Sequence, residues 1–481
     1  MKAKYHVVIV GSGIGGLSTA EVLSGNGLDI LLIDENVHLG GQLLRKSERY
    51  SKNIFKFDPD IIKTKGFSLI QKTRESTDVI DRISRAQVLG IFNNKRLLIH
   101  TEAPENPNKK SGQILEVQAE HLVLATGARE RYLPFKGWTL PGVMSLGAAQ
   151  ILMKSHGVLP AYNTLIAGTS PLMMPLASEI LSNQGKVAAV LDGNPFSKKL
   201  DFLPLIHHHW PKLVEGAFYT TKMMLKRVPM INRARVIEAR GKESFESVIM
   251  AKTTSEGGII NGTETEYPAG ALAIGHGFVP NIELAVQAGC DIEYQKAKGG
   301  WVVTADRNLE SSVDDLYAVG EITGIAGGKK SYIQGKIAAV SILKRLDKLN
   351  FKKQSTHLSK QMKQLYSLNH KQTAYAGFLN HLCQLPALAY QQIPDETLIC
   401  RCEDITMGTI KKAIQQDFIT SGGLKKATRC SMGRCQGRIC GTIILDIIMA
   451  FTGKSPEKIG PSLARAPVKN VAISSFLDPA G

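Results

Sequence analysis

Five of the seven cysteines lie close together near the carboxyl end of the chain, where free thiols could bind a metal. Cys400 and Cys402 form a C-x-C pair, and Cys430, Cys435 and Cys440 follow in the segment CSMGRCQGRIC. Zinc sites usually pair cysteines two to four residues apart, so these spacings better suit thiolates around a two-iron cluster. The alternatives are small buried thiols, which pack as hydrophobic side chains, and a disulfide framework. The density of thiols and the lack of a secretion signal favour the cluster and one-electron transfer.

The cysteine segment resembles the small domain of bacterioferritin-associated ferredoxin in the stretches CRCEDIT and TRCSMGRCQGRICG. Members of that family carry C-x-C followed by C-Q-G-x-x-C. The resemblance implies a [2Fe-2S] cluster whose four ligands are Cys400, Cys402, Cys435 and Cys440. Cys430 is then a spare thiol. We expect the turn at Gly433 to lead into a helix whose amino end directs backbone N–H groups at the anionic cluster.

The amino-terminal residues have the pattern of a dinucleotide-binding βαβ unit: apolar strand, glycine turn, helix, and a second apolar strand that ends in acid. Gly11 permits a tight turn, Gly13 lets the backbone approach a pyrophosphate, and Gly16 lets helix and strand pack closely. Asp34, followed by Glu35, lies where a carboxylate can accept hydrogen bonds from an adenosine ribose. The alternative is a glycine-rich turn without a ligand.

Three further segments resemble those of flavoproteins with two dinucleotide-binding domains. They are LGGQLLR at 39–45, EHLVLATGARERYLPFKGW at 120–138 and SVDDLYAVGEITG at 312–324. The resemblance implies that the cofactor is FAD. The site residues that it adds are Gly41, Gln42, Thr126, Gly127, Gly320 and Glu321. In these flavoproteins the last motif ends in Gly-Asp, whose carboxylate meets the ribityl chain, and the longer Glu321 keeps the charge and changes its reach.

A second Rossmann-like unit follows in the middle of the chain, with a damaged glycine signature. After Gly168, Ser170 and Met173 stand where glycines are usual, so the backbone cannot approach a pyrophosphate as closely. The pattern predicts the fold of an NAD(P)-binding domain over residues 151–270. Three alternatives remain for its ligand: NAD(P), another adenine nucleotide, or none. Residues 271–281, ALAIGHGFVPN, are predicted to return the chain to the flavin domain.

These patterns predict an α/β protein with two Rossmann-like dinucleotide-binding domains of the pyridine nucleotide-disulfide oxidoreductase type and a small carboxyl-terminal helical iron–sulfur domain. The length of 481 residues allows about three domains, and 43% apolar with 21% charged residues is ordinary for a folded soluble protein. The predicted parts are an FAD-binding domain of residues 1–150 and 271–345, an NAD(P)-binding-like domain 151–270, a connector 346–390, a [2Fe-2S] domain 391–460 and a tail 461–481. The apolar run GTIILDIIMAF from Gly441 is predicted to form a core helix behind the cluster.

Several kinds of site are absent from the sequence. Disulfide reductases of this architecture need a C-x-x-C or C-x4-C pair beside the flavin, and the flavin and middle segments contain none. Cys290 and Cys383 are isolated. The IHHHW run at Ile206 is not expected to bind a metal, because adjacent histidines point in different directions. No catalytic triad is found, and no catalytic residue can be assigned.

The formal net charge is +17, with lysines scattered along the chain. No basic helix or aromatic RNA-binding motif accompanies them, so we expect a solvated surface and no nucleic acid partner. An anionic membrane or an acidic partner is the alternative. The first strand begins at once, which leaves no room for a signal peptide, and no apolar run of 18 residues is present. We expect a cytoplasmic protein, with peripheral attachment to the inner membrane as an alternative.

Over nearly its whole length the chain resembles the FAD-containing A or alpha subunit of bacterial amine and amino-acid dehydrogenase complexes. The A subunit of opine oxidase, the B subunit of hydrogen cyanide synthase and the alpha subunits of dye-linked proline and hydroxyproline dehydrogenases belong to this family. The resemblance rests on ATGARERYLPFKGWTLPGV, TLICRCEDIT, TRCSMGRCQGRIC and ARAPVKNVAIS. In such complexes a separate subunit built like a D-amino-acid oxidase generally oxidises the substrate.

The family resemblance implies an FAD and [2Fe-2S] electron-transfer subunit of a heteromeric amine or amino-acid dehydrogenase of the opine, proline, hydroxyproline or glycine type. A flavin can accept two electrons and release them singly, and a two-iron cluster passes one at a time. The implied partners are a D-amino-acid-oxidase-like catalytic subunit and either a small ferredoxin-like subunit or a membrane electron acceptor. The alternatives are a self-sufficient NAD(P)H-dependent flavin and iron–sulfur reductase, and a scaffold subunit with vestigial sites.

Overall fold

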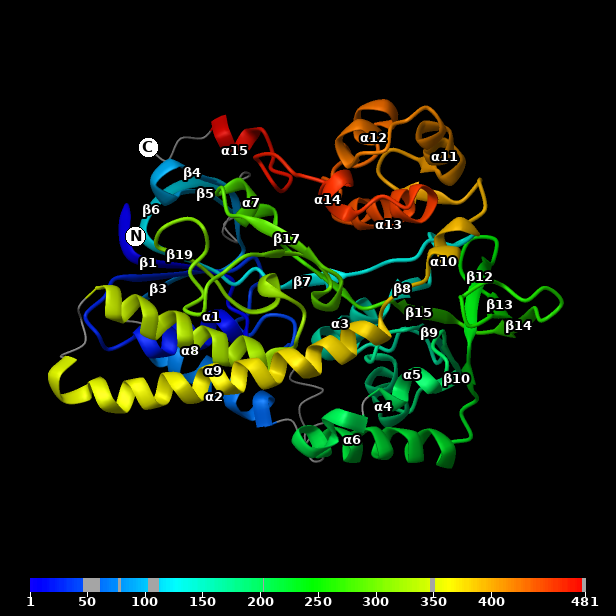
Figure 1. The fold of residues 1–481 in the computed structure, drawn as a ribbon, viewed down its shortest axis with the longest axis horizontal. Helices are drawn as coiled ribbons and strands as arrows, with labels where there is room; N and C mark the ends of the chain where they lie inside the picture. The colour runs from blue at the N-terminus through cyan, green and yellow to red at the C-terminus, as the bar shows by residue number, and fades with distance from the viewer. Residues whose placement is uncertain (46–60, 77–78, 103–111, 202, 347–350, 478–481) are drawn as a thin grey trace.

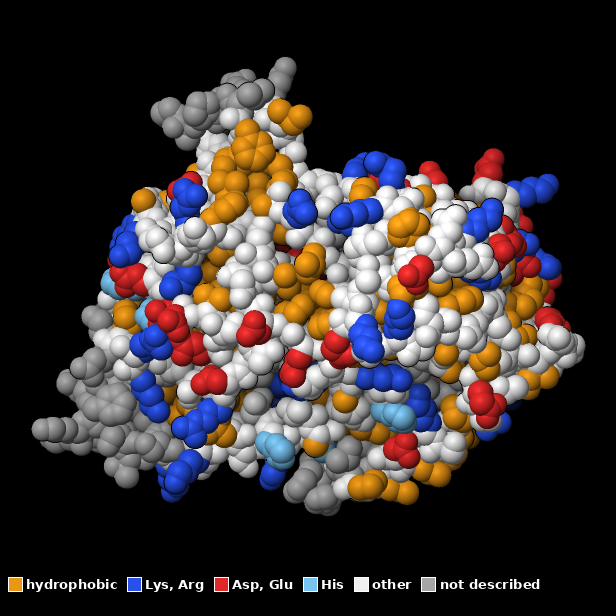
Figure 2. Space-filling view, turned by 45° about the horizontal axis from the view of Figure 1, so that its top comes forward, with side chains coloured by type: hydrophobic (Ala, Val, Ile, Leu, Met, Phe, Trp, Pro, Cys, Tyr) orange, Lys and Arg blue, Asp and Glu red, His pale blue; other side chains and the backbone are white. Residues whose placement is uncertain are grey.

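The computed structural model describes residues 1–45, 61–76, 79–102, 112–201, 203–346 and 351–477 (Figure 1). Two regions are built on parallel sheets, and a third, near the carboxyl end, is mostly helical. The first two lie side by side, and the helical region lies above the second in the view of Figure 1. Lysine and arginine side chains are scattered over the face seen in Figure 2, between acidic ones, rather than gathered in one patch.

The first sheet has the strand order β3-β2-β1-β6-β5-β4, and β19 also pairs with β6. Its parallel strands are β1 (Lys4–Val10), β2 (Ile30–Ile33), β3 (Ile80–Ile83), β6 (Gln113–Leu124) and β19 (Leu316–Ala318), and the antiparallel ones are β4 (Ala86–Phe92) and β5 (Arg96–Thr101). The register aligns Val10 with Ile33 on one side and with Leu124 on the other. The central strands β1 and β2 are apolar and almost wholly buried, as expected where a parallel sheet is covered on both faces.

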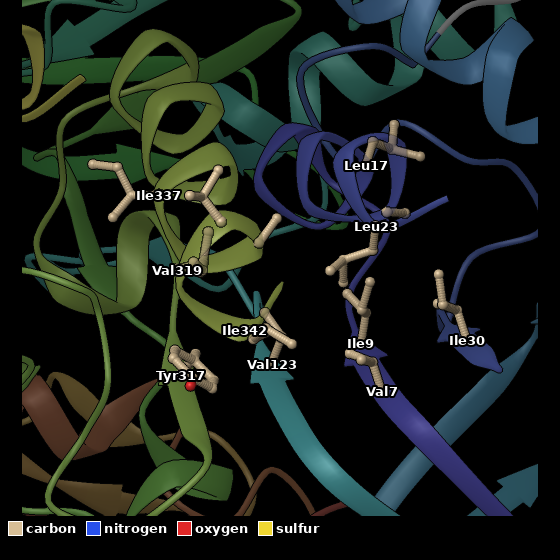
Figure 3. Packing of buried hydrophobic residues seen from close by; sticks show 14 of the residues in the cluster. Val7, Ile9, Leu17, Leu23, Ile30, Val123, Tyr317, Val319, Ile337 and Ile342 are labelled. Carbon is tan, nitrogen blue, oxygen red and sulfur yellow. The ribbon is translucent and has the colours of Figure 1, made fainter. Parts of the chain in front are cut away.

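Helices α1 (Ile14–Leu23) and α8 (Gly328–Arg345) pack together against one face of this sheet, as Figure 3 shows. The two helices approach closely because a Cβ at Gly335 would lie 2.3 Å from the carbonyl oxygen of Gly15. Leu17 and Ile337 are fully buried in the core that these helices form with the sheet, and burying a side chain of this size stabilises the fold by roughly 1.5–3 kcal/mol. The same layer contains α2 (Ile61–Glu75) and the long helix α9 (Phe351–Leu382).

The second region contains a parallel sheet of order β11-β10-β9-β15-β8. Its strands are β8 (Val143–Ser145), β9 (Asn163–Gly168), β10 (Lys186–Asp192), β11 (Met230–Asn232) and β15 (Ala271–Gly275). The helices of this region are α3 (Leu146–His156), α4 (Met173–Ser182), α5 (Ser197–Leu200) and α6 (Ile206–Leu225). A separate antiparallel sheet consists of β12 (Ala234–Arg240), β13 (Ser247–Lys252) and β14 (Thr265–Pro268).

Short elements return the chain to the first region after β15. They are β16 (Phe278–Pro280), which pairs with β7 (Ala128–Glu130), then α7 (Glu283–Gln287), β17 (Ile292–Gln295) and β18 (Gly300–Val303). Among the described residues, single turns of 3-10 helix are η2 (Asn93–Lys95), η3 (Leu203–Leu205), η4 (Lys296–Lys298) and η5 (Gly320–Thr323). The crossing predicted over residues 271–281 therefore comprises β15 and β16.

The helical region begins after α9. Its elements are α10 (Ala387–Gln391), β20 (Leu398–Cys400), β21 (Ile405–Thr406), α11 (Met407–Gln415), α12 (Ser421–Thr428), α13 (Cys440–Thr452) and α14 (Pro456–Ile459). Helix α13 contains the apolar run from Gly441 and is buried along most of its length, so the predicted core helix is observed. No helix formed by described residues combines the length and apolarity that crossing a bilayer requires.

The last described residues pack back onto the first region rather than extending away from it. The Val468 amide donates to the Leu89 carbonyl at 2.8 Å, and the Val468 side chain is part of a buried core beneath β4. Lys469 forms an ion pair with Glu35, and the short helix α15 (Ser474–Leu477) places Ser475 beside His100. Much of the segment predicted as a tail thus covers the first sheet.

Candidate functional site

The residues predicted to bind a dinucleotide gather at one edge of the first sheet. Gly11 follows β1, Asp34 follows β2, Thr126 lies just beyond β6, and Gly320 lies just beyond β19. These strands are adjacent and parallel, so their carboxyl ends lie together. β1 is flanked by β2 and β6, which makes this edge the kind of crevice where open α/β sheets bind nucleotides.

In the glycine turn after β1, two glycines are needed for packing within the protein, and one faces open space. A Cβ at Gly11, which has φ +106°, would lie 2.3 Å from the Ala125 carbonyl oxygen, and a Cβ at Gly16 would lie 1.9 Å from the Gly11 carbonyl oxygen. These two glycines are required by the protein's own packing. A Cβ at Gly13 would meet no atom within 4 Å, so the space in front of this residue is open to a ligand.

The amino end of α1 faces this open space. Gly13 is the N-cap residue, no side chain caps the helix, and its first turn holds no acidic residue. The free N–H groups and the positive end of the helix dipole are suited to a pyrophosphate. Gly41 closes the space from the other side, because a Cβ there would lie 2.9 Å from the Gly13 Cα, and the neighbouring Gln42 is exposed.

Asp34 is buried and held in place by four hydrogen bonds. Its Oδ2 accepts from the Ser12 amide at 2.6 Å and from the Ser12 hydroxyl at 2.7 Å. Its Oδ1 accepts from the Asn36 amide at 2.7 Å and from the Asn36 side chain at 2.9 Å. The carboxylate is thereby fixed next to the glycine turn. Glu35 points instead to Lys469, whose pKa is lowered by burial.

Thr126 and Gly127 are tied to the chain that returns from the second region. The Thr126 hydroxyl donates to the Asn281 carbonyl at 2.8 Å, and the Asn281 side chain donates back to the Thr126 carbonyl at 3.0 Å. The Asn281 amide donates to the Gly127 carbonyl at 3.0 Å. Gly127 has φ +72° and open space where a Cβ would be, so the backbone could lie against a ligand here.

Glu321 lies in η5, directly after Gly320. Its carboxylate accepts from the Gly327 amide at 2.6 Å and, more weakly, from the Ala326 amide, just before α8 begins. Burial raises the pKa of Glu321 above its ordinary value. The nearby Lys330 is buried as well, and burial lowers its pKa to about 8. The adjacent Gly320 has φ +81° and donates its amide to Gln334 at 2.8 Å.

The carboxyl-terminal cysteines converge on one pocket. The sulfur atoms of Cys400, Cys430 and Cys440 all lie within 4.8 Å of one another, and all three residues are buried. Cys402 and Cys435 form a neighbouring pair, whose thiols contact each other. Cys435 also contacts Cys440, which joins the pair to the group of three. The pocket therefore brings the four predicted ligands together and includes the spare thiol Cys430 as well.

Contacts among these thiols shift their protonation. Hydrogen bonds from Cys430 and Cys440 lower the pKa of Cys400, and a hydrogen bond from Cys440 lowers the pKa of Cys435 to about 5. The pKa values of Cys430 and Cys440 are raised in turn. Because the thiolate is the form that binds a metal, these contacts favour metal-binding thiolates at Cys400 and Cys435 but not at Cys440.

The local backbone brings the two cysteine segments into contact. Cys400 ends β20, and Cys440 is the first residue of α13, so the helix amino end lies at Cys440. The helix predicted to follow the Gly433 turn thus begins later than Cys435, which lies in the turn before it. A Cβ at Gly433 would lie 2.3 Å from the Cys402 Cβ, so a larger residue would separate the segments. The Ser431 hydroxyl lies 3.3 Å from the Cys440 sulfur.

The segment that follows Gly127 joins the two sites. Arg129 donates from Nε to the Arg438 carbonyl at 2.9 Å, two residues before Cys440, and pairs with Glu283 at 2.7 Å. The Trp138 indole donates to the Leu398 carbonyl at 2.8 Å, two residues before Cys400. Each of these bonds links the segment after Gly127 to a segment that contains one of the clustered cysteines.

A buried ion pair strengthens this interface. Arg131 approaches Asp446 of α13 at 3.6 Å, and the Asp446 carboxylate accepts from the Tyr390 hydroxyl at 2.6 Å. The flavin motif itself did not indicate these contacts. The signal that could have found them is the spacing of Arg129 and Arg131, which places two cationic side chains on the same face of an extended segment.

The turn of the second Rossmann-like region is covered by its own chain. Gly168 has φ +127°, and a Cβ there would lie 1.9 Å from the Gly275 carbonyl oxygen. The Cys383 thiol, just beyond α9, lies 3.9 Å from the Thr169 carbonyl, and Lys198 donates to the Gln384 carbonyl at 3.4 Å. Ser170 is buried, and α4 begins at Met173.

The isolated cysteines do not provide a reactive thiolate. Burial raises the pKa of Cys383 to about 12, and burial also raises the pKa of Cys290. Thiol–disulfide exchange requires a thiolate, so neither residue fits a redox-active pair. Of the residues that the structure describes, only the carboxyl-terminal thiols form a group that could hold a metal ion.

Comparisons with known proteins agree with this architecture. Residues 5–342 match the family model described as pyridine nucleotide-disulphide oxidoreductase, and residues 395–477 match the model of the sarcosine oxidase A3 domain. Hydrogen cyanide synthase subunit HcnB of Pseudomonas aeruginosa is 31% identical over 481 residues, which cover 98% of this chain and 97% of that protein. The opine oxidase A subunit of Rhizobium meliloti is 29% identical over 478 residues, covering 98% of this chain and 87% of that protein.

A solved structure resembles the whole chain. The L-proline dehydrogenase of P. horikoshii superposes with a TM-score of 0.68 at 20% identity, covering 98% of this chain and 79% of that chain. At this identity the likeness concerns the fold. Together with the match of residues 5–342, it confirms the predicted fold class.

Proposed function

We propose a role in electron transfer for this chain, starting from its family. The chain belongs to the pyridine nucleotide-disulphide oxidoreductase family and to the group of the opine oxidase A subunit and hydrogen cyanide synthase subunit HcnB. The resemblance drawn from the sequence is confirmed, and the chain is an FAD-dependent oxidoreductase. We propose that it is the FAD and [2Fe-2S] electron-transfer subunit of a heteromeric amine or amino-acid dehydrogenase. Its partner would be a D-amino-acid-oxidase-like subunit that oxidises the substrate.

The observation that carries this proposal is the contact between the two candidate sites. The segment that follows Thr126 and Gly127 makes two hydrogen bonds to the cysteine segments. Arg129 bonds to the segment that contains Cys440, and Trp138 bonds to the segment that contains Cys400. Bound at these sites, FAD would exchange two electrons and the cluster would pass them singly. The role of Arg129 and Trp138 would be to hold the two electron carriers at a fixed separation.

Each candidate residue has a role in this proposal. Gly13 and the amino end of α1 would hold the pyrophosphate of FAD, Asp34 the adenosine ribose, and Thr126 with Gly127 the inner half of the cofactor. Gly41, Gln42, Gly320 and Glu321 would complete the flavin site. Cys400, Cys402, Cys435 and Cys440 would hold the cluster. The final acceptor would be a small ferredoxin-like subunit or a membrane carrier.

A test with reduced nicotinamide separates this role from a self-sufficient NAD(P)H-dependent reductase. The covered turn at Thr169 supports the relay, because the chain around Cys383 lies where the nicotinamide cofactor would approach the second sheet. We expect that anaerobic mixing of the flavin-loaded chain with NADH or NADPH leaves the flavin absorbance unchanged over minutes, whereas dithionite bleaches it. Rapid stoichiometric bleaching by either nucleotide would support the reductase and contradict the relay.

A further inference from the structure

Helix α6 turns an apolar face away from the protein. Its exposed apolar side chains include Trp210, Leu213, Val214, Phe218, Met224 and Leu225. Trp210 is 61% exposed, Phe218 50% and Leu225 78%. At about 100° per residue all six fall within less than half of the helix circumference. Isolated exposed apolar residues are common, whereas a contiguous row of this kind marks an interaction site.

The opposite side of α6 meets the protein through polar as well as apolar groups. Met223 is fully buried, and the Lys222 ammonium donates to the Ser178 carbonyl at 2.8 Å and to the Ser182 hydroxyl at 2.6 Å, both on α4. His209 stacks on Tyr375 of α9 with ring centroids 4.5 Å apart. A surface helix normally buries its apolar stripe, so the arrangement here is inverted.

The charges near this face are basic. The exposed Lys226 and Arg227 follow directly after α6, whereas the Lys222 ammonium is turned toward α4. The helix has one acidic residue, Glu215, whose carboxylate is paired with Lys212 at 2.6 Å. The net charge of the whole chain is +17. An anionic surface would therefore be attracted to the helix while its apolar side chains are buried.

From this arrangement we infer that α6 docks the protein on the surface of an anionic lipid bilayer, lying in the plane of the interface. Figure 1 shows the helix along the lower edge of the molecule, outside α4 and α5. An amphipathic helix with Trp, Phe and Leu on one side and basic residues at its end has features that such interfacial helices share. The inference concerns a binding surface and does not depend on the electron-transfer role.

The test is sedimentation of the flavin-loaded chain with vesicles of phosphatidylcholine and phosphatidylglycerol at low salt. We expect the wild type to sediment with these vesicles, weakly with pure phosphatidylcholine, and less as salt is added. The variant F218E/L225E should bind at least tenfold less. Both positions are exposed, so the thermal unfolding midpoint should stay within a few degrees. The control is Ile473→Glu, which changes an exposed residue of the distant last segment and should bind like the wild type.

Tryptophan fluorescence gives a second readout. Of the three tryptophans, Trp138 is buried and Trp301 is partly buried, so a blue shift on adding vesicles should come from Trp210. The variant W210F should bind and lose this shift. Equal binding by F218E/L225E and the wild type would overturn the inference. Failure of the wild type to bind would overturn it too, as would a change from dimer to monomer caused by F218E/L225E, which would assign this face to a second copy.

Discussion

Replacing Gly13 with valine should leave the fold intact and abolish the retention of FAD. The new Cβ would meet no protein atom within 4 Å, so we expect the side chain to occupy the position of the pyrophosphate rather than to displace the protein. We expect FAD per chain, measured by absorbance after purification, to fall at least tenfold. The unfolding midpoint should match that of wild-type protein stripped of its flavin.

Two controls separate ligand loss from misfolding. Gly377→Val places the same side chain at another glycine with open space, in α9, and should keep its FAD. Gly16→Val should instead destabilise the protein by several kcal/mol, because its Cβ would lie 1.9 Å from the Gly11 carbonyl oxygen. Stoichiometric FAD in purified Gly13→Val protein would show that this turn does not bind the cofactor.

Serine in place of any one of Cys400, Cys402, Cys435 and Cys440 should remove most of the iron–sulfur cluster. A site with three thiolates is open to solvent and loses iron, so the EPR signal of the reduced protein and the acid-labile sulfide should both fall several-fold. Cys430→Ala should leave both almost unchanged. Cys290→Ser is the matched control, because it also removes a buried thiol but lies far in sequence from the clustered cysteines.

The position of Cys430 makes this comparison decisive. Its sulfur lies within 4.8 Å of those of Cys400 and Cys440, so distance alone does not exclude it as a ligand. The assignment of Cys430 as the spare thiol rests on the C-x-C and C-Q-G-x-x-C pattern. If Cys430 proved essential and Cys440 dispensable, the second ligand pair would shift toward the amino end and the ferredoxin-like assignment would be wrong.

The parts of the fold that depend on local sequence could be predicted well. The first βαβ unit is observed as β1, α1 and β2, because its apolar runs and glycines fix a strand, a tight turn and a helix over short distances. The second unit is observed as β9, α4 and β10 despite Ser170 and Met173. Its Gly168 keeps the positive φ and the close approach to Gly275 that the first turn requires.

Contacts between distant segments could not be predicted in the same way. The residues around Val468 were expected to form a tail, yet this side chain fills part of the core under β4, because the sheet leaves an apolar surface there that the sequence does not reveal. The bond from Arg129 to Arg438 joins residues far apart in sequence. The outward face of α6 was missed for a related reason: its spacing shows an amphipathic helix but not which side faces the protein.

The central claim, that one chain holds both a flavin and a two-iron cluster in electronic contact, is tested most directly by stepwise anaerobic reduction of purified protein. Flavin absorbance and the EPR spectrum would be followed together after FAD, iron, zinc and acid-labile sulfide are measured. The account predicts about one FAD, two iron and two sulfide per chain, and a reduced-cluster signal that appears as the flavin exchanges electrons with it. Zinc in place of iron in anaerobically prepared protein would contradict the account, as would a cluster that stays oxidised while the flavin is fully reduced.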